Sequence, residues 1–215
     1  MDSVPFFNNL SMSTEELFQQ LKHPNPHLRD QAMWEIAENR DETTIPRLMS
    51  ILDEEDTTYR RAAVKALGVI GADTITPLVE ALLNSDNVTV RGSAAKALAQ
   101  VVINYPDVPL SDEGVQGLKT ALNDPNPVVN LAVVMALGEM GSPVVDILIE
   151  ALQTTDNPAL AISLVSALGS IGDSRGVDVL TALIADESTD SYVRESATSA
   201  LSRLKMVVKM NRGNH

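Results

Sequence analysis

The side chains with the clearest chemical potential in this chain are a few cations within a strongly acidic sequence. The 215 residues contain 16 Lys and Arg against 29 Asp and Glu, which gives a formal charge of −13. Arg61, Lys65 and Lys96 nevertheless form a cationic stretch, which suits a carboxylate-bearing ligand or an acidic segment of a partner protein. The alternative is a solvated face on which these cations make local salt bridges.

A second set of cations recurs at one position of a repeated pattern. Four guanidinium groups at regular spacing could bind phosphates or carboxylates. Each one, however, follows an expected helix cap, so we expect it to pair with an aspartate of an adjacent turn in a ladder that joins unit to unit. This arginine column consists of Arg29, Arg60, Arg91 and Arg194, and it is interrupted at Asn130 and Ala161.

The remaining side chains offer few candidates for catalysis or metal binding. The histidines are His23, His27 and His215; none is followed by Glu, and two prolines between the first two favour a turn over a metal site. No histidine is placed to activate a serine, and no glycine-rich phosphate loop joins a strand to a helix. With zero cysteines, the chain offers no thiolate ligand, disulfide or cysteine nucleophile. We therefore expect no catalytic residue and no metal site.

Charge and hydropathy also bear on partners and location. An excess of negative charge repels nucleic-acid phosphate and anionic lipid. No apolar run approaches the roughly 20 residues of a membrane span, and residues 1–13 lack the basic start and apolar stretch of a signal peptide. We expect a cytoplasmic protein that binds neither nucleic acid nor membrane.

A repeated helical unit must position these side chains. The alanines of five Ala-Leu pairs fall at positions 66, 97, 136, 167 and 200, in steps of 31, 39, 31 and 33 residues. A degenerate sixth copy around Arg29 precedes Arg60 by 31 residues. This period holds two short helices but no independent domain, so each unit must bury its apolar face against its neighbours. The sequence predicts an all-α, right-handed α-solenoid of about six helical hairpins.

The pattern within one unit is helix, turn, helix. First helices are expected at about 14–22, 43–52, 74–84, 111–123, 142–153 and 176–185. In the second helices the apolar residues form one stripe. The expected caps of these second helices are Asp86-Asn87, Asp124, Asp156 and Asp190. Glycines at positions 68, 71, 138, 141, 169 and 172 are expected to end the second helices in a left-handed conformation.

Three segments depart from the repeat. The second helix of the third unit continues without glycines into residues 103–110, where two prolines predict an exposed loop, either a contact site or a tolerated insertion. Residues 1–13 and the basic residues 205–215 are expected to be flexible tails. A single repeat array is therefore expected over residues 14–204.

Function has to be sought on the surface of this array. Second helices are expected to line a concave groove with their outward-facing residues. Leu131, Met135 and Ile162 occupy outward positions that are polar in other units, so they should form an exposed apolar patch, unless a tighter superhelix buries them. Trp34 either anchors an interface or seals the first unit. The expected groove comprises His27, Asp30, Gln31, Trp34, Glu38, Thr58, Arg61, Lys65, Gly92, Ser93, Lys96, Leu131, Met135, Glu139, Ile162, Ser163, Ser166, Glu195, Ser199 and Arg203.

The repeated pattern also resembles a known family. The motif Asp-x-x-x-Val-Arg-x-x-Ala-x-x-Ala-Leu-Gly-x-Ile-Gly stands here at residues 59–71, at 86–98 and, most specifically, at 171–180 followed by Tyr192-Val193-Arg194. It resembles the HEAT-like repeats of the cyanobacterial phycobilin lyases of the E/F type, over roughly residues 14–204. In that family two such solenoids pair to bind a linear tetrapyrrole and attach it to a cysteine of a phycobiliprotein. Related members act as chaperones, take part in phycobilisome turnover or bind an iron–sulfur assembly scaffold.

The resemblance implies, first, a non-catalytic scaffold or chaperone that binds a protein in its groove and is linked to phycobiliprotein or phycobilisome biogenesis. The alternatives are a subunit of a heterodimeric phycobilin lyase and a partner of an iron–sulfur assembly scaffold. The implied partners are a phycobiliprotein, a second HEAT-repeat subunit or that scaffold, and the implied cofactor is at most a transiently bound bilin. The isomerising lyases share an Asn-His-Cys motif, which this cysteine-free chain lacks, so isomerase activity is not expected.

Overall fold

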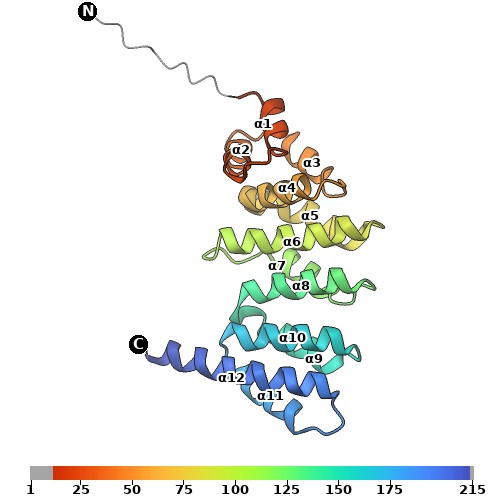
Figure 1. The fold of residues 1–215 in the computed structure, drawn as a ribbon, viewed down its shortest axis with the longest axis vertical. Coiled ribbons are helices and arrows are strands. Elements are labelled where there is room, and N and C mark those ends of the chain that lie inside the picture. The colour runs from red at the N-terminus through yellow and green to blue at the C-terminus, as the bar shows by residue number, and fades with distance from the viewer. Residues whose placement is uncertain (1–11, 214–215) are drawn as a thin grey trace, which may run out of the picture.

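The computed structural model describes residues 12–213 as two layers of helices stacked into an elongated array (Figure 1). The first helices of the six pairs are α1 (Thr14–Gln20), α3 (Thr44–Met49), α5 (Ile75–Asn84), α7 (Asp112–Ala121), α9 (Val145–Thr154) and α11 (Arg175–Ala185). The second helices are α2 (Pro26–Glu38), α4 (Thr57–Ile70), α6 (Val88–Asn104), α8 (Pro127–Met140), α10 (Pro158–Ile171) and α12 (Ser191–Gly213). Two short 3-10 helices, η1 (Gly71–Thr74) and η2 (Ser142–Val144), precede α5 and α9. The predicted all-α solenoid of six hairpins is confirmed.

One continuous core runs through all six pairs. It extends from Leu17 to Leu204 and consists mainly of Leu, Ala, Val and Ile. The leucines of the repeated Ala-Leu pairs are buried in its centre, as Leu67 and Leu98 show with exposures of 0%. Because no hairpin could bury this seam alone, stacking supplies most of the stability.

The second helices start at asparagine and aspartate caps. Asn87, Asn126 and Asn157 each accept a hydrogen bond from the backbone N–H two residues ahead, at 2.8–3.0 Å. The predicted caps at Asp124 and Asp156 are therefore wrong, because the capping oxygen comes from the asparagines that follow them by two residues and by one. Asp190 caps α12 as predicted, accepting from Tyr192 N–H at 2.9 Å.

The glycines near the helix ends serve two different purposes. Gly71, Gly141 and Gly172 end their helices with φ of 81°, 70° and 79°, values that favour glycine. The predicted left-handed conformation is found at Gly172, whereas ψ at Gly71 and Gly141 is −132° and −143°. Gly68, Gly138 and Gly169 were expected to end helices in the same way, but they lie within α4, α8 and α10. A Cβ on Gly169 would stand 2.7 Å from Cβ of Ala200 on α12, so this position needs glycine because the next unit packs so closely.

The arginine column does not form the predicted ladder. Arg29 donates to its own turn, at the carbonyl of His23 (2.6 Å), and Arg60 donates to the carbonyl of Glu54. Within residues 12–213, Arg91 alone among the four arginines forms an ion pair. Arg29, Arg60 and Arg91 therefore tie α2, α4 and α6 to the turns that precede them, because the carbonyls six residues back lie within reach. In the described part of the chain Arg194 makes no such bond, and its Nε is buried without a partner.

Two further expectations need correction. The expected tail from residue 205 is helical as far as Gly213, because α12 continues without a break; residues 1–11 lie outside the described part. One stretch, Thr57–Asn84, is long and apolar enough to span a membrane by length and composition, contrary to the expectation of no such run. It comprises α4, η1 and α5, with a turn at Gly71, and 61% of its most apolar window is buried, as in core helices.

The last unit has a polar outer side. Thr198 and Ser202 are exposed on α12. Their equivalents in the preceding unit, Val165 and Gly169, are buried. This side of α12 is therefore more polar than the corresponding side of α10.

Candidate functional site

The second helices carry a charge opposite to that of the rest of the chain. They hold eleven of the Lys and Arg residues against five Asp and Glu, a net charge of +6. Since the whole chain carries −13, the remaining residues carry −19. The layer formed by α2, α4, α6, α8, α10 and α12, here called the second-helix face, is thus the surface on which an acidic partner would be least repelled.

The cationic stretch lies at the N-terminal end of this face. Arg61 and Lys65 are exposed on α4 and line a cleft of about 280 Å³ between α4 and α2. Lys65 Nζ lies 3.6 Å from a carboxylate oxygen of Asp30, and both side chains are about half exposed, so this pair contributes little to stability. Lys96 is exposed on α6, and neither it nor Arg61 has an ion-pair partner among residues 12–213.

The three apolar residues singled out in the sequence meet at one cleft. Leu131 and Met135 on α8 are 49% and 58% exposed, and with the half-buried Ile162 on α10 they line a space of about 580 Å³. Packing leaves these side chains accessible, in contrast to the alternative in which a tighter superhelix buries them. That they bind a partner stays a prediction.

The cleft exists because α10 presents small serine side chains here, whereas α8 presents larger apolar ones. The floor is formed by Ser163, Ser166 and Ser170, and the α8 wall by Met135. The hydroxyls of Ser163 and Ser170 donate to carbonyls within α10, at 3.0 and 3.1 Å. From the other side, Arg203 of α12 reaches Ser166 Oγ at 3.4 Å. The result is an apolar trough with satisfied hydroxyls on its floor and a cation at its edge.

A second cleft extends the trough toward the N-terminal ends of the same two helices. It has a volume of about 330 Å³ and includes Val128 of α8 and Leu160 of α10. Leu131 and Ser163 line both spaces, so the two adjoin. We call the combined space the α8–α10 trough.

Some predicted groove residues lie elsewhere. Trp34 is 52% exposed on α2 and lines neither the α2–α4 cleft nor the α8–α10 trough. Gly92 and Ser93 were expected to face outward, but both are buried. Ser93 donates to the carbonyl of Leu52 at 3.3 Å, so it serves the packing between units. The structure therefore shows one face with two separate clefts rather than one uniform groove.

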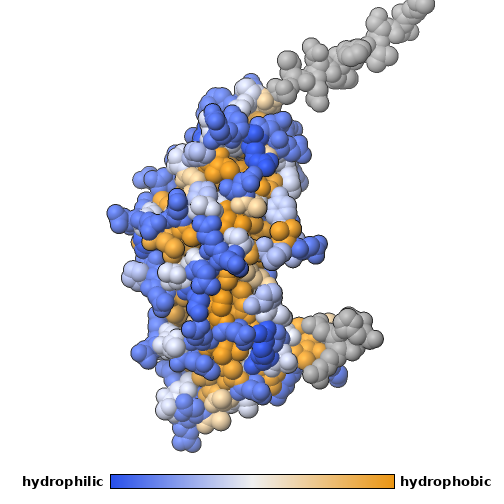
Figure 2. Space-filling model, turned by 180° about the vertical axis from the view of Figure 1, so that it is seen from behind, coloured by the Kyte–Doolittle hydropathy of each residue, from blue (hydrophilic) through white to orange (hydrophobic). Residues whose placement is uncertain are grey.

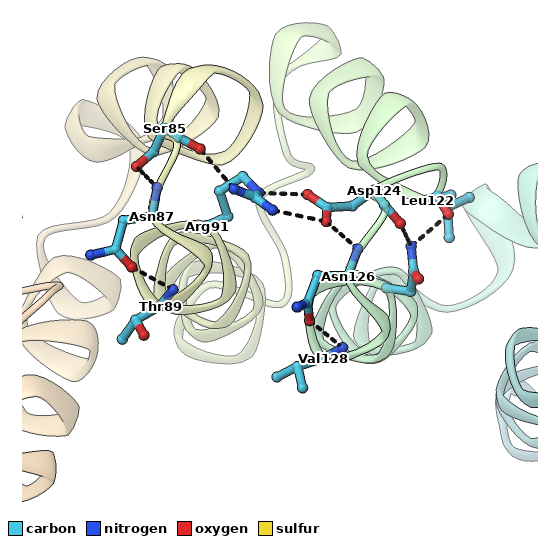
Figure 3. Close-up of polar contacts among 9 residues, drawn as sticks. Ser85, Asn87, Thr89, Arg91, Leu122, Asp124, Asn126 and Val128 are labelled. Carbon is cyan, nitrogen blue, oxygen red and sulfur yellow. Dashed lines mark hydrogen bonds and ion pairs between the residues drawn. The ribbon is translucent and has the colours of Figure 1, made fainter.

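A buried ion pair joins the third unit to the fourth, as Figure 3 shows. Arg91 donates from Nε to Asp124 at 2.7 Å and from Nη1 to the carbonyl of Ser85 at 2.8 Å. The two charged side chains are only 12% and 7% exposed. Burial alone would raise the pKa of Asp124, but hydrogen bonds from Arg91 and from the Asn126 N–H outweigh it and lower that pKa. The pair therefore holds the two units in a fixed register.

The predicted loop at residues 103–110 begins inside α6 and packs back on the array. The Tyr105 hydroxyl donates to the carbonyl of Val69, and the ring covers Gly71. Leu110 is buried while Val108 is 60% exposed. The segment is thus a partly packed insertion, not a free loop, and it borders an apolar space of about 330 Å³.

Sequence reasoning missed part of the site. Ser170 completes the floor of the trough, and Met206 and Met210 follow Arg203 along α12 with exposures of 60% and 69%. Ser170 was detectable as a small residue at an outward position, but the methionines were assigned to a tail. In the part of the chain that the structure describes, no group of three His, Asp or Glu side chains could hold a metal ion.

These features define an α-solenoid with an open second-helix face, and comparison with known proteins assigns its family. A family model for HEAT repeats matches residues 14–99 and 115–202, on either side of the insertion. The chain therefore belongs to the HEAT-repeat family. The structure of human deoxyhypusine hydroxylase is similar with a TM-score of 0.51 and 20% identity, covering 90% of this chain and 84% of that one, which reflects a shared fold.

Two relatives place the chain within that family more closely. It is 72% identical over 201 residues to the uncharacterized phycocyanin operon protein Z of Pseudanabaena tenuis, covering 94% of this chain and all of that protein. It is 34% identical over 174 residues to the bilin biosynthesis protein CpeZ of a Synechococcus strain, covering 78% of this chain and 93% of that protein. The resemblance to the phycobilin lyase E/F family is thereby confirmed.

Proposed function

We propose that this chain is a non-catalytic scaffold or chaperone in phycobiliprotein biogenesis, which binds a phycocyanin-type protein through its second-helix face. The observation that carries the proposal is the sequence similarity to phycocyanin operon protein Z, at 72% identity over 201 residues and 94% of this chain. The geometry supports it, because the face offers accessible apolar contacts and cations rather than an acid–base pair or a nucleophile. Leu131 and Met135 supply the apolar contacts, since both are about half exposed and lie one turn apart on α8.

A second candidate is a lyase subunit that holds a bilin together with another HEAT-repeat chain. It is favoured by the name of CpeZ, a bilin biosynthesis protein, and by Arg61 beside a cleft of about 280 Å³. A guanidinium group there could pair with a bilin propionate. No relative described above is connected with iron–sulfur assembly, and we do not pursue that alternative.

One experiment separates the two candidates. The purified chain is mixed with apo-phycocyanin subunits and followed by size-exclusion chromatography with light scattering, and it is mixed separately with free phycocyanobilin and followed by absorption. A scaffold forms a complex with the apoprotein and leaves the bilin spectrum unchanged. A bilin-holding subunit produces a red-shifted and stronger absorption band. Failure to bind the apoprotein would refute the scaffold.

A further inference from the structure

The α8–α10 trough differs in shape from a pocket for a small molecule. Its two parts, about 580 and 330 Å³, share Leu131 and Ser163 and run along both helices. Since α8 and α10 have 14 residues each, the trough is about 20 Å long. Small-molecule sites bury most of their ligand, whereas Leu131 and Met135 at this rim remain half exposed. An elongated occupant that contacts the protein along one side fits this shape.

The wall on the α12 side continues beyond the body of the array. Met206 and Met210 follow Arg203 by three and seven residues, so the three side chains share one face of α12. Figure 2 shows apolar surface where α12 leaves the body. Flexible thioether side chains adapt to the apolar face of a bound helix. Met135 lines the trough itself, whereas Met206 and Met210 are not among the residues that line it and would meet an occupant that extends along α12.

The charges around the trough favour an acidic occupant. Arg203, Lys205 and Lys209 are exposed on the α12 side, and Lys96 is exposed on α6, the second helix that packs against α8. Glu139 is the single acidic residue among those that line the trough. A basic occupant would therefore meet repulsion on both flanks, whereas an acidic one would find cations on both.

We propose that the α8–α10 trough binds an amphipathic α-helix of the partner protein, with its apolar side on Leu131, Met135 and Met206 and acidic residues facing Arg203 and Lys96. The narrow serine floor lets a helix approach α10 closely, and the apolar walls receive side chains at the spacing i, i+3, i+4 and i+7. This inference rests on the proposed function in that the partner is a protein, and it specifies which element of that protein is bound.

The absence of cysteine allows a direct test on the full chain. Ser199, exposed on α12, is replaced in Ser199→Cys and labelled with an environment-sensitive fluorophore. The probe is a synthetic Leu/Glu amphipathic helix of about 18 residues, slightly longer than the trough, and a Leu/Lys helix of the same pattern is the matched peptide. We expect a saturable blue shift with the acidic peptide and at least about tenfold weaker binding of the basic one. Equal binding of the two, or none of the acidic peptide, overturns the proposal.

Three variants locate the binding. Ser166→Leu fills the floor of the trough and Met135→Ser shortens one wall. Each variant should weaken binding of the acidic peptide about tenfold. Leu83→Ser is the matched control, since Leu83 is an exposed leucine on α5 in the other layer. Unchanged binding in both trough variants overturns the site. If Ser166→Leu still binds apo-phycocyanin normally, the trough is not the binding site for the partner, but the proposed scaffold function is retained. If the wild-type chain binds the acidic peptide but not apo-phycocyanin, the trough binds a helix and the proposed scaffold function is refuted.

Discussion

Single side chains decide how the units are joined, and Asp124 is the clearest case. Its carboxylate accepts from Arg91 at 2.7 Å and from the Asn126 N–H at 2.8 Å, and it is almost buried. Charged hydrogen bonds of this kind are individually strong, and removing one partner leaves the other buried without compensation. The exposed pair of Arg175 with Asp146, in which the carboxylate is 77% exposed, makes a natural comparison.

We predict that Asp124→Ala lowers the free energy of unfolding by about 2–3 kcal/mol, whereas Asp146→Ala lowers it by less than about 0.5 kcal/mol. Urea unfolding at neutral pH measures both. Because the pKa of Asp124 is lowered in the folded protein, its contribution is present above the unfolded pKa of about 4 and is lost as the pH falls through the folded value. The difference between wild type and Asp124→Ala should therefore shrink in acid. Equal losses for the two variants would contradict the argument.

The sequence shows the arginine column but not its partners. Four arginines at one repeat position are visible without a structure, whereas the acceptor of each depends on the turn that faces it. Within residues 12–213, only the fourth unit brings an aspartate, Asp124, within hydrogen-bond distance of a column arginine of the preceding unit. In the second unit the arginine meets a carbonyl of its own turn instead. The acceptor of each arginine therefore depends on the tertiary structure around it, which the repeat spacing alone does not specify.

At the scale of the helix, one repeated glycine position illustrates what packing adds. Gly138 and Gly169 occupy equivalent places in α8 and α10. A Cβ on Gly138 would come no closer than 3.7 Å to Cβ of Ala167, an ordinary contact. A Cβ on Gly169 would stand 2.7 Å from Cβ and 2.9 Å from Cα of Ala200. The same substitution should therefore have opposite effects at the two positions.

We predict that Gly138→Ala stabilises the protein by about 0.5–1 kcal/mol, because alanine loses less conformational entropy in a helix. Gly169→Ala should destabilise it by about 1–3 kcal/mol, because α12 must move away. Thermal and urea unfolding of the two variants provide the comparison. Stabilisation by both would show that the contact between α10 and α12 yields easily.

The helices themselves were predictable, because a period of 31 to 39 residues and the leucine stripe recur along the chain. First helices were correctly placed, with starts that differ from the structure by up to three residues. The end of α12 was not, since basic residues after Leu204 suggested a tail and the helix runs on to Gly213. The trough was half predictable: Leu131 and Met135 stand out as apolar, but a hollow depends on the short serines between them and α12.

For the whole molecule, the junction between the third and fourth units is the one whose connection departs most from the repeat. HEAT-repeat matching is interrupted there, between residues 99 and 115, and the inserted segment replaces the regular turn. Arg91 and Asp124 bridge this junction from the other side of the hairpins. In a repeat array, cooperativity depends on the interface between each pair of neighbours, so weakening one interface can divide the unfolding transition.

We predict that Arg91→Ala makes urea unfolding less steep, with residues 14–104 and 112–213 losing protection from hydrogen exchange at different denaturant concentrations. Lys119→Ala is the control, because the pair that it breaks with Glu150 also joins neighbouring units but is exposed. That variant should keep one steep transition. An unchanged slope in Arg91→Ala would mean that apolar stacking alone couples the two halves.

The polar outer side of α12 has a consequence for assembly. Solenoid units are self-complementary, so an array whose last helix ended in an apolar seam could receive the first unit of another molecule and grow into a fibre. Thr198 and Ser202 place hydroxyl groups on the side of α12 that such a contact would bury. An end-to-end contact of this kind is therefore disfavoured, and the second-helix face is the better surface for a partner.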